Sequence, residues 1–216
     1  ALVPPGVPPS WRASNAEWVY VDDLRQFTPD DDERVVQASS LPIVVDEEIY
    51  RANTPSEHEP LRVLLCGAWD NEKHGIDDGY GAVAHARWFH QTIDLIRVSA
   101  WAPSREEPIE AVQEFHVALT STEMTRLMHS CDVLLAPNRR EDRLPLPSAE
   151  GLAAGLACVM TAIPAHSFDE RRDYALFAPA DNAVELGERL IELLGDRDLR
   201  ESLRLRGRDV AEQWRI

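Results

Sequence analysis

The segment with the most chemical potential is 142–155, with the sequence DRLPLPSAEGLAAG. Two carboxylates, Asp142 and Glu150, lie eight positions apart, and the second opens a small apolar run typical of a helix. We therefore expect Glu150 in the first turn of a helix and Asp142 on the preceding loop. A helix N-terminus binds phosphate through backbone N–H groups and partial positive charge, and a neighbouring carboxylate accepts hydrogen bonds from sugar hydroxyls. The segment predicts a nucleotide-sugar pocket; the alternative is an exposed loop followed by a capped helix.

The same segment resembles the signature of the retaining glycosyltransferases of family four, which have the GT-B fold. Their pattern is E-G-F-G-L-P-x-x-E-A-M-A-x-G. Asp142 stands in place of the first glutamate and Glu150 matches the second, and four further positions agree: Leu146, Pro147, Ala153 and Gly155. The likeness continues upstream through 115–120 and 131–137, downstream through 174–179, and covers about Leu61 to about Trp214.

This resemblance implies roles for both carboxylates, which are the candidate catalytic residues. Glu150 would bind the ribose hydroxyls of a nucleotide sugar, and Asp142 would reach the hydroxyls of the transferred sugar. Asp142 has a shorter side chain than glutamate, so its reach is smaller. The alternative for Glu150 is a carboxylate that only interacts with the helix dipole. The resemblance further implies hexose transfer with retention, without metal or cofactor, the nucleoside-diphosphate sugar being the substrate.

A second segment, from Gly67 to Gly75 (GAWDNEKHG), resembles the family's G-R-x-D-x-x-(R/K)-K-G, whose arginine and lysine hold the donor pyrophosphate. The arginine position is Ala68 here, and His74 takes the lysine position, with Lys73 one residue earlier. Gly67, Lys73 and His74 are thus candidate donor-binding residues. We expect Lys73 to meet the diphosphate, because lysine stays charged at neutral pH. The alternative for both side chains is an exposed polar turn.

Two loops complete the predicted donor site. At the positions of Arg143, Leu144 and Pro145 the family is glycine-rich and binds sugar and phosphate through backbone N–H groups, which Pro145 lacks. Arg143 either replaces the missing arginine or faces water. The turn 117–119, which includes Leu119, resembles the family's main-chain contact with the nucleotide base. Its alternative is the plain end of a strand.

Composition and charge exclude several classes of protein. The 216 residues have a net charge of −16, which argues against nucleic acid or an anionic membrane as partner, because both require a basic face. No apolar run is long enough to span a membrane, and the first residues lack the charged region of a signal peptide. Three cysteines without C-x-x-C spacing favour reduced, buried thiols. We expect a cytoplasmic protein.

The chain divides into two parts. Residues 1–60 contain prolines, an acidic turn and one plausible strand at 17–21, and we expect an N-terminal arm, hinge and linker. Residues 61–216 alternate strands at 62–67, 93–98, 133–136 and 157–161 with helices at 77–90, 121–129, 148–156, 182–194 and 199–214. Ser121 is the expected N-cap of the helix that ends at His129. Alternation favours an α/β fold, a Rossmann-like doubly wound parallel sheet. The predicted site segments would then meet at the carboxyl ends of the strands, where such sheets bind ligands.

Other motifs add little. The aspartates of 30–32 and 196–198 fit a D-x-D metal pattern but lie in predicted turns, so we predict no metal site. His166, Ser167 and Asp169 lack the strand–turn–helix context of a catalytic serine. A dinucleotide fingerprint is absent from the sequence, which argues against an epimerase or another Rossmann enzyme.

Two hypotheses of different classes remain. The first is the donor-binding half of a GT-B glycosyltransferase, whose acceptor, a sugar, lipid or protein, would bind a missing N-terminal domain. The second is a degenerate, non-catalytic module that binds or scaffolds. Four departures from the family pattern favour it: Ala68, His74, Asp142 and Pro145. Binding of a nucleoside diphosphate separates the two.

Overall fold

The computed structural model describes residues 18–21, 37–40, 58–69, 71–89, 91–140 and 145–212 of the chain. The chain divides into two compact units, residues 1–44 and 45–216. The boundary that we placed at residue 60 from the sequence stays a prediction.

The first unit contains two described strands. β1 (Trp18–Val21) pairs in parallel with β2 (Gln37–Ser40). The sequence predicted β1 but missed β2, because the run Gln-Ala-Ser-Ser has neither β-branched residues nor an alternating apolar pattern. The expectation of a single strand in this region is therefore wrong.

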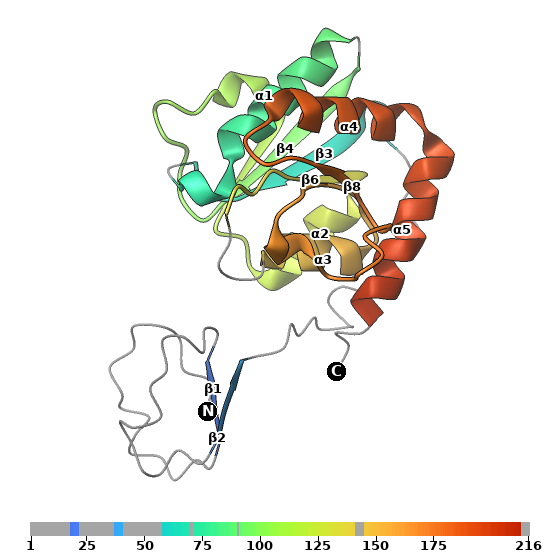
Figure 1. Ribbon diagram of the computed structural model, residues 1–216. Helices are drawn as coiled ribbons and strands as arrows, with labels where there is room; N and C mark the ends of the chain where they lie inside the picture. Colours follow the sequence, from blue (N-terminus) through green and yellow to red (C-terminus); the bar gives the residue numbers. More distant parts are fainter. Residues whose placement is uncertain are drawn as a thin grey trace. The chain divides into compact units, whose positions relative to one another are not determined.

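The second unit is built on a six-stranded parallel sheet (Figure 1). Its strands are β3 (Leu61–Cys66), β4 (Ile93–Ser99), β5 (Glu114–Val117), β6 (Val133–Ala136), β7 (Ala157–Thr161) and β8 (Leu176–Ala178). Their order is β5-β4-β3-β6-β7-β8, and each strand pairs in parallel with its neighbours. The direction of winding reverses between β3 and β6, as in a doubly wound Rossmann sheet. The predicted fold class is confirmed.

Helices cover both faces of this sheet because its central strands are apolar on both sides. α1 (Ile76–Trp88) and α4 (Ala183–Gly195) lie on one face, and α2 (Ser121–His129) and α3 (Leu146–Ala154) on the other (Figure 1). Neighbouring strand positions serve opposite faces: Leu135 belongs to the core cluster that includes residues of α1 and α4, whereas Leu134 packs against Gly151 of α3.

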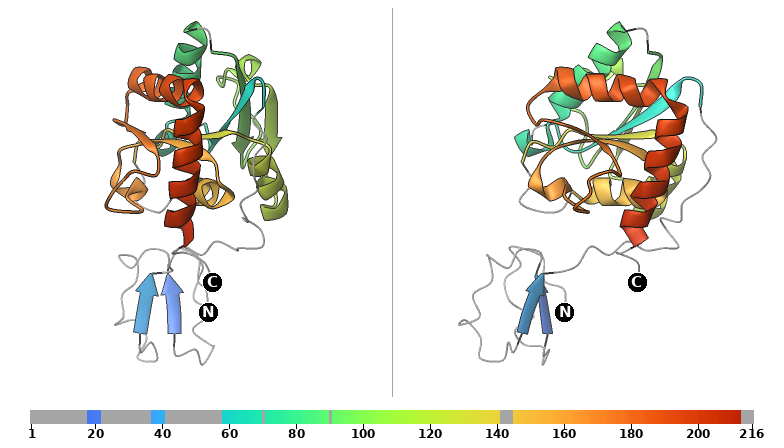
Figure 2. Two further views of the ribbon diagram at one scale, coloured as in Figure 1. Left: turned by 90° about the vertical axis from the view of Figure 1, so that its right-hand side faces the viewer. Right: turned by 45° about the vertical axis from the view of Figure 1, so that its right-hand side comes forward.

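The last helix, α5 (Arg197–Ala211), turns sharply away from α4 and packs along α3 (Figure 2). Asp196 begins it by accepting a hydrogen bond from the N–H of Leu199. The helix predicted at 199–214 therefore starts two residues earlier than expected, because aspartate is a strong N-cap.

The connection between β4 and β5 contains no α-helix. Residues 100–113, between β4 and β5, contain only the short 3₁₀ helix η5 (Ile109–Ala111). Ser121 was predicted as the N-cap of α2, but the cap lies one residue earlier, because Thr120 and Glu123 form a reciprocal capping box. The carboxyl end of β5 is thereby fixed directly before α2.

The fully buried Asp132 connects the amino ends of β3 and β6 through hydrogen bonds. Its carboxylate accepts a hydrogen bond of 2.8 Å from the N–H of Arg62 and lies 3.1 Å from Nδ1 of His58. Arg204 of α5 donates to the Asp132 carbonyl at 3.2 Å. This cluster joins the first strand of the sheet to the last helix.

Two of the three free cysteines, Cys131 and Cys158, are buried, whereas Cys66 is partly buried. In the described part of the chain, none of the helices combines the length and the apolar character needed to cross a bilayer.

Candidate functional site

A cavity of about 210 Å³ lies at the carboxyl ends of β3 and β6, where the winding of the sheet reverses. Open α/β sheets bind their ligands at this place. Two predicted donor-binding residues, Gly67 and His74, line the cavity together with the first turn of α3. Its described lining consists of Cys66, Gly67, His74, Leu134, Leu135, Ala136, Asn138, Pro145, Pro147 and Ser148.

The turn after β3 forms one wall of the cavity. Gly67 has a φ of 141°, and its N–H donates to the carbonyl of Val98 at 3.0 Å. The N–H of Ala68 donates to Nδ1 of His74 at 2.8 Å. The other ring nitrogen, Nε2, lies 3.1 Å from Nδ2 of Asn71, so both nitrogens of the ring have hydrogen-bond partners within the turn. Lys73 lies beside it on the 3₁₀ helix η4 (Glu72–His74) with an exposed side chain.

The position of this turn is fixed by the loop after β6. Gly75 has a φ of 60°, and a Cβ built on it would lie 2.1 Å from the carbonyl oxygen of Pro137. The N–H of Arg139 donates to the carbonyl of Lys73 at 2.8 Å. A side chain larger than hydrogen at Gly75 would therefore separate the two loops that form the cavity mouth.

Arg139 also makes ion pairs with three aspartates. Its guanidinium lies 2.7 Å from Asp77, 2.8 Å from Asp78 and 2.9 Å from Asp181. The hydrogen bond with Asp78, followed by that with Asp77, raises the pKa of Arg139. Arg139 was not predicted from the sequence, although a basic side chain three residues after a buried strand, at the edge where such sheets bind ligands, is a usable indication.

The first turn of α3 forms the opposite wall. The helix begins at Leu146, so Glu150 lies in its second turn and the prediction of the first turn is wrong. The physical reason is Pro147, whose fixed φ and missing N–H suit a helix start. The N–H groups of Ser148 and Ala149 both donate to the carbonyl of Pro145, at 2.9 Å and 3.3 Å. These two groups are thus already engaged within the turn.

Glu150 is partly buried and lies near the end of β3. Burial is the main cause that raises the pKa of the Cys66 thiol, and the negative charge of Glu150 raises it further. Cys66 lines the cavity, so Glu150 is close to it. The other predicted residues of this segment, Asp142, Arg143 and Leu144, lie outside the described residues.

Leu119 lies at the same edge of the sheet, two strands away from the cavity. It follows Ala118, which has a φ of 50° and donates its N–H to the carbonyl of Ser99 at 2.9 Å. A left-handed conformation at a non-glycine residue costs of order 1–2 kcal/mol. The turn is thus held at the carboxyl end of β5, and its contact with a base stays a prediction.

A buried polar network lies behind the cavity. The hydroxyl of Ser148 is 3.0 Å from Nε2 of His166, and Nδ1 of His166 is 2.8 Å from the carbonyl oxygen of Thr161. Burial lowers the pKa of His166 to about 4. This pair was not predicted from the sequence, because its members are 18 positions apart and on different elements.

A second buried network lies below the turn after β3. Nε of Arg97 donates to Glu107 at 2.8 Å, and the hydroxyl of Tyr80 donates to the same carboxylate at 3.1 Å. Arg97 also donates to the carbonyls of Leu65 and Val98. The network therefore supports the end of β3 from the side of α1.

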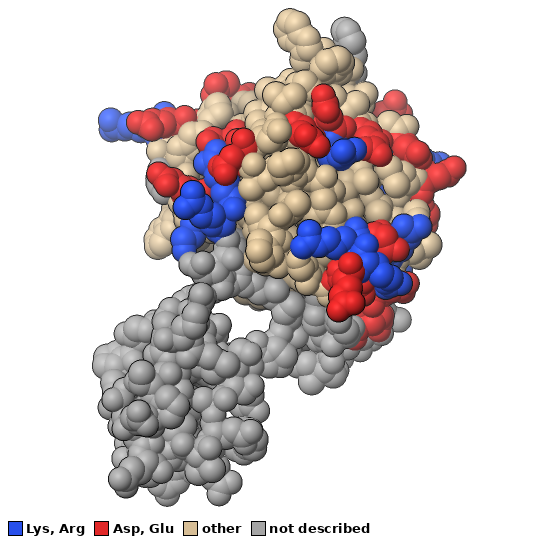
Figure 3. Space-filling view, viewed as in Figure 1, with Lys and Arg blue, Asp and Glu red and all other residues tan. Residues whose placement is uncertain are grey.

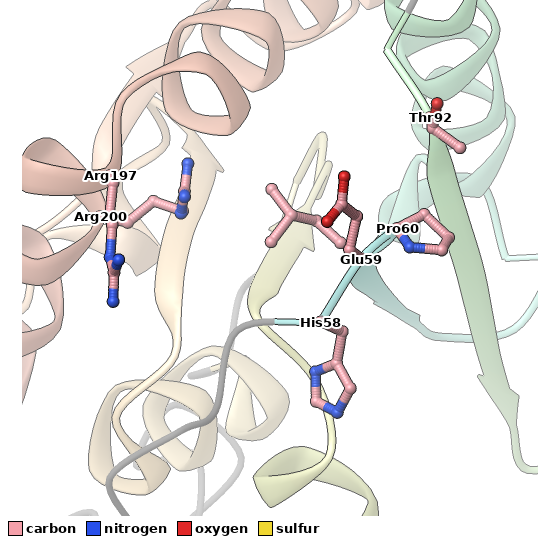
Figure 4. A pocket seen from close by; sticks show the side chains of 7 residues that line it. His58, Glu59, Pro60, Thr92, Arg197 and Arg200 are labelled. Carbon is pink, nitrogen blue, oxygen red and sulfur yellow. The ribbon is translucent and has the colours of Figure 1, made fainter.

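A larger hollow of about 690 Å³ lies at the opposite, amino ends of the strands (Figure 4). Its described lining is His58, Glu59, Pro60, Leu61, Thr92, Arg197 and Arg200, none of which was predicted as a site residue. Arg200 donates to the carbonyls of Leu193 and Leu194 at 2.9 Å and 2.7 Å. It thereby closes the end of α4, which is a structural role.

Within the described ranges, no three His, Cys, Asp or Glu side chains come together as metal ligands would. On the face shown in Figure 3, acidic and basic side chains of the described residues stand in mixed groups.

The model of the family described as glycosyl transferases group 1 matches residues 60–196, more than half of the chain. The chain belongs to this family. No curated protein sequence matches it.

Several solved structures have the same fold as this chain. The chain is similar to the C-terminal domain of the group 1 glycosyl transferase LpcC from Francisella tularensis, with 14% identity, a TM-score of 0.60, and coverage of 78% of this chain and 97% of that domain. It is similar to HepE from Anabaena in complex with UDP and glucose, with 14% identity, a TM-score of 0.65, and coverage of 92% and 59%. It is also similar to WaaG, a glycosyltransferase involved in lipopolysaccharide biosynthesis, with 20% identity and a TM-score of 0.66. This match covers 87% of this chain and 54% of WaaG. The chain thus spans just over half the length of HepE and WaaG.

Proposed function

We propose that residues 61–216 bind a nucleoside-diphosphate sugar and form the donor-binding half of a cytoplasmic glycosyltransferase. The observation that carries this proposal is the cavity at the switch point of the sheet, lined by Gly67, His74 and the first turn of α3. Family membership and the UDP and glucose bound to HepE support a nucleotide sugar as ligand. The acceptor, a sugar, lipid or protein, would bind a second domain that faces this one.

The proposed reaction transfers a hexose with retention and without a metal or cofactor. Its main electrostatic task is stabilisation of the diphosphate leaving group. Lys73 supplies an exposed positive charge beside the cavity, and the N-terminus of α3 adds its dipole. Glu150 would hold the ribose, and the turn at Leu119 would contact the base.

Three further roles follow the family pattern. Asp142 would bind hydroxyls of the transferred sugar. Arg143 and Leu144 would contact the donor from the loop between β6 and α3. These roles rest on sequence resemblance alone.

Calorimetry with the full chain tests donor binding directly. We expect one of UDP, GDP, ADP or TDP, or its sugar derivative, to bind, and a ligand at 100 times its Kd to stabilise the fold by about 2.7 kcal/mol. Glu150→Ala should weaken binding by roughly 10- to 100-fold, since hydrogen bonds to a charged group contribute about 1.5–3 kcal/mol. Glu188→Ala, which removes an exposed glutamate of α4, is the control. Equal affinities for the wild type and Glu150→Ala would remove Glu150 from the site.

A second experiment separates Lys73 from His74 as the phosphate ligand. We expect Lys73→Met to weaken nucleoside-diphosphate binding at every pH between 6 and 8. His74→Ala should have a smaller effect, because Nδ1 of His74 already accepts from Ala68. A strong gain of affinity on acidification that His74→Ala abolishes would assign the contact to His74.

A binding module without catalysis is the second candidate function. Two contacts favour it: His74 occupies the N–H of Ala68, and the N–H groups of Ser148 and Ala149 are bonded within their own turn. Binding of a nucleoside diphosphate by the full chain, measured by the calorimetry above, distinguishes the candidates. Assays of donor hydrolysis and sugar transfer test catalysis separately. Background rates with a panel of sugar, lipid and protein acceptors are expected for the chain alone, because positioning of two substrates supplies on the order of 7–11 kcal/mol and requires both walls of the cleft. Steady turnover that is lost in Asp142→Ala would contradict this expectation.

A further inference from the structure

The wall of the cavity contains a serine, Ser148, whose hydroxyl is hydrogen-bonded to the buried His166. Ser148 lines the cavity, and its Oγ lies 3.0 Å from Nε2 of His166. Ser148 is 1% exposed and His166 is fully buried, so water does not compete for this hydrogen bond. The hydroxyl of Tyr174 donates to the His166 carbonyl and fixes the backbone of the histidine.

The direction of the bond follows from the other side of the ring. Nδ1 of His166 lies 2.8 Å from the carbonyl oxygen of Thr161, which can only accept, so Nδ1 carries the proton. In the neutral ring Nε2 is then an acceptor, and the Ser148 hydroxyl must donate to it. The Thr161 hydroxyl oxygen lies 3.4 Å from Nδ1 and gives its own proton to the carbonyl of Asn138, so toward the ring it too can only accept.

The histidine stays neutral under ordinary conditions, because burial lowers its pKa to about 4. Arg172 lowers it further, whereas the bond to Thr161 opposes the shift. At neutral pH the Ser148 hydroxyl therefore always donates its only proton to Nε2. Toward a ligand, the Ser148 oxygen can act only as a hydrogen-bond acceptor.

We propose that Ser148 acts as an obligate hydrogen-bond acceptor in the cavity, kept in that state by His166, and that it accepts a hydrogen bond from a hydroxyl group of the transferred sugar. This inference rests on the proposed function. A phosphate oxygen is excluded as the partner, because it is itself an acceptor. The ribose is assigned to Glu150, which lies two residues further along α3 and so projects from a different side of the helix. Ser148 is thus a specificity-determining residue, and His166 is a positioning residue that acts through it.

The same pair could be mistaken for a nucleophile and its base. A base must take up the serine proton, and a histidine with a pKa of about 4 holds it poorly at neutral pH. We therefore expect no labelling of Ser148 by a fluorophosphonate, and stoichiometric labelling would overturn the proposal.

Calorimetry of the full chain with UDP and with UDP-glucose, or with the matching pair of the base that binds best, tests the acceptor role. Ser148→Ala should weaken UDP-glucose binding about tenfold and leave UDP within twofold, as expected for one hydrogen bond to a neutral group. Deoxyglucose donors that each lack one hydroxyl sharpen the test, because the donor lacking the contacted hydroxyl should bind the wild type and Ser148→Ala equally. Ser130→Ala, at the end of α2, is the matched control.

The role of His166 is tested through selectivity. His166→Gln should reduce the ratio of UDP-glucose to UDP affinity about as much as Ser148→Ala, and the double variant should lose no more than either single variant. A merely structural role would weaken both ligands equally. Equal losses for UDP and UDP-glucose, or no loss for UDP-glucose, would refute the inference while leaving the proposed function intact. If the wild type binds no member of the nucleotide panel, the proposed function and this inference both fail.

Discussion

Replacement of His166 by glutamine should change how the stability of the protein depends on pH. The folded ring is neutral down to a pKa of about 4, because it is buried, whereas the unfolded ring titrates near its ordinary value of 6.5. Above pH 6.5 neither state binds a proton. As the pH falls from 6.5 to 4, only the unfolded state gains the proton, so the free energy of unfolding falls. The difference between the folded and unfolded pKa of His166 corresponds to a decrease of about 3 kcal/mol in the free energy of unfolding.

Urea unfolding of the full chain, followed by tryptophan fluorescence between pH 4 and 7.5, measures this effect. Between these limits the wild type should lose about 3 kcal/mol more than His166→Gln. The comparison uses the change with pH and not the absolute stability, since the variant also loses hydrogen bonds. Ser148→Ala is the control: it removes the bond to Nε2 but leaves the ring buried, so most of the pH dependence should remain. Parallel curves for the wild type and His166→Gln would refute the argument that burial keeps the ring neutral.

Three further substitutions probe the elements that position the site, each measured by denaturant unfolding. Gly75→Ala should destabilise the fold by at least about 2 kcal/mol, because the φ of Gly75 is 60° and the new Cβ would clash with the carbonyl oxygen of Pro137. The control is Gly195→Ala, which has open space around it and should be neutral or stabilising. Glu107→Ala should cost about 3–5 kcal/mol, because it leaves the guanidinium of Arg97 buried without its carboxylate, and a cost below 1 kcal/mol would mean that water reaches Arg97. Thr120→Ala should cost about 1 kcal/mol through loss of the capping box, and an unchanged midpoint would show that the cap adds nothing to the start of α2.

Elements with local causes were predicted well from the sequence. β6 and β7 begin and end at the predicted residues, because each is a short run of mostly apolar residues, and the end of α2 at His129 was also predicted. Two predicted donor-site segments meet at the cavity because parallel strands bring their carboxyl ends to one edge. For these features, the decisive interactions lie within a few positions along the chain.

The failures concern interactions between distant residues. Pro147 allowed α3 to begin before Ser148, a choice that depends on how the preceding loop packs. The pairing of Ser148 with His166 and that of Arg97 with Glu107 follow only from the three-dimensional fold. From the sequence, His166 was considered only with Ser167 and Asp169, and that grouping was rejected as a catalytic triad, whereas the structure pairs His166 with a serine on another element.

The position of β3 at the centre of the sheet has a consequence for synthesis on the ribosome. β3 is the first strand of the sheet to emerge, and it pairs with β4 soon afterwards, but its other partner, β6, begins only at Val133. Until then one edge of an apolar strand remains open, and such edges recruit other chains. Closure of that edge also requires contacts between residues far apart in the sequence, which slows folding. Nascent chains that pause before β6 should therefore be the most prone to aggregate.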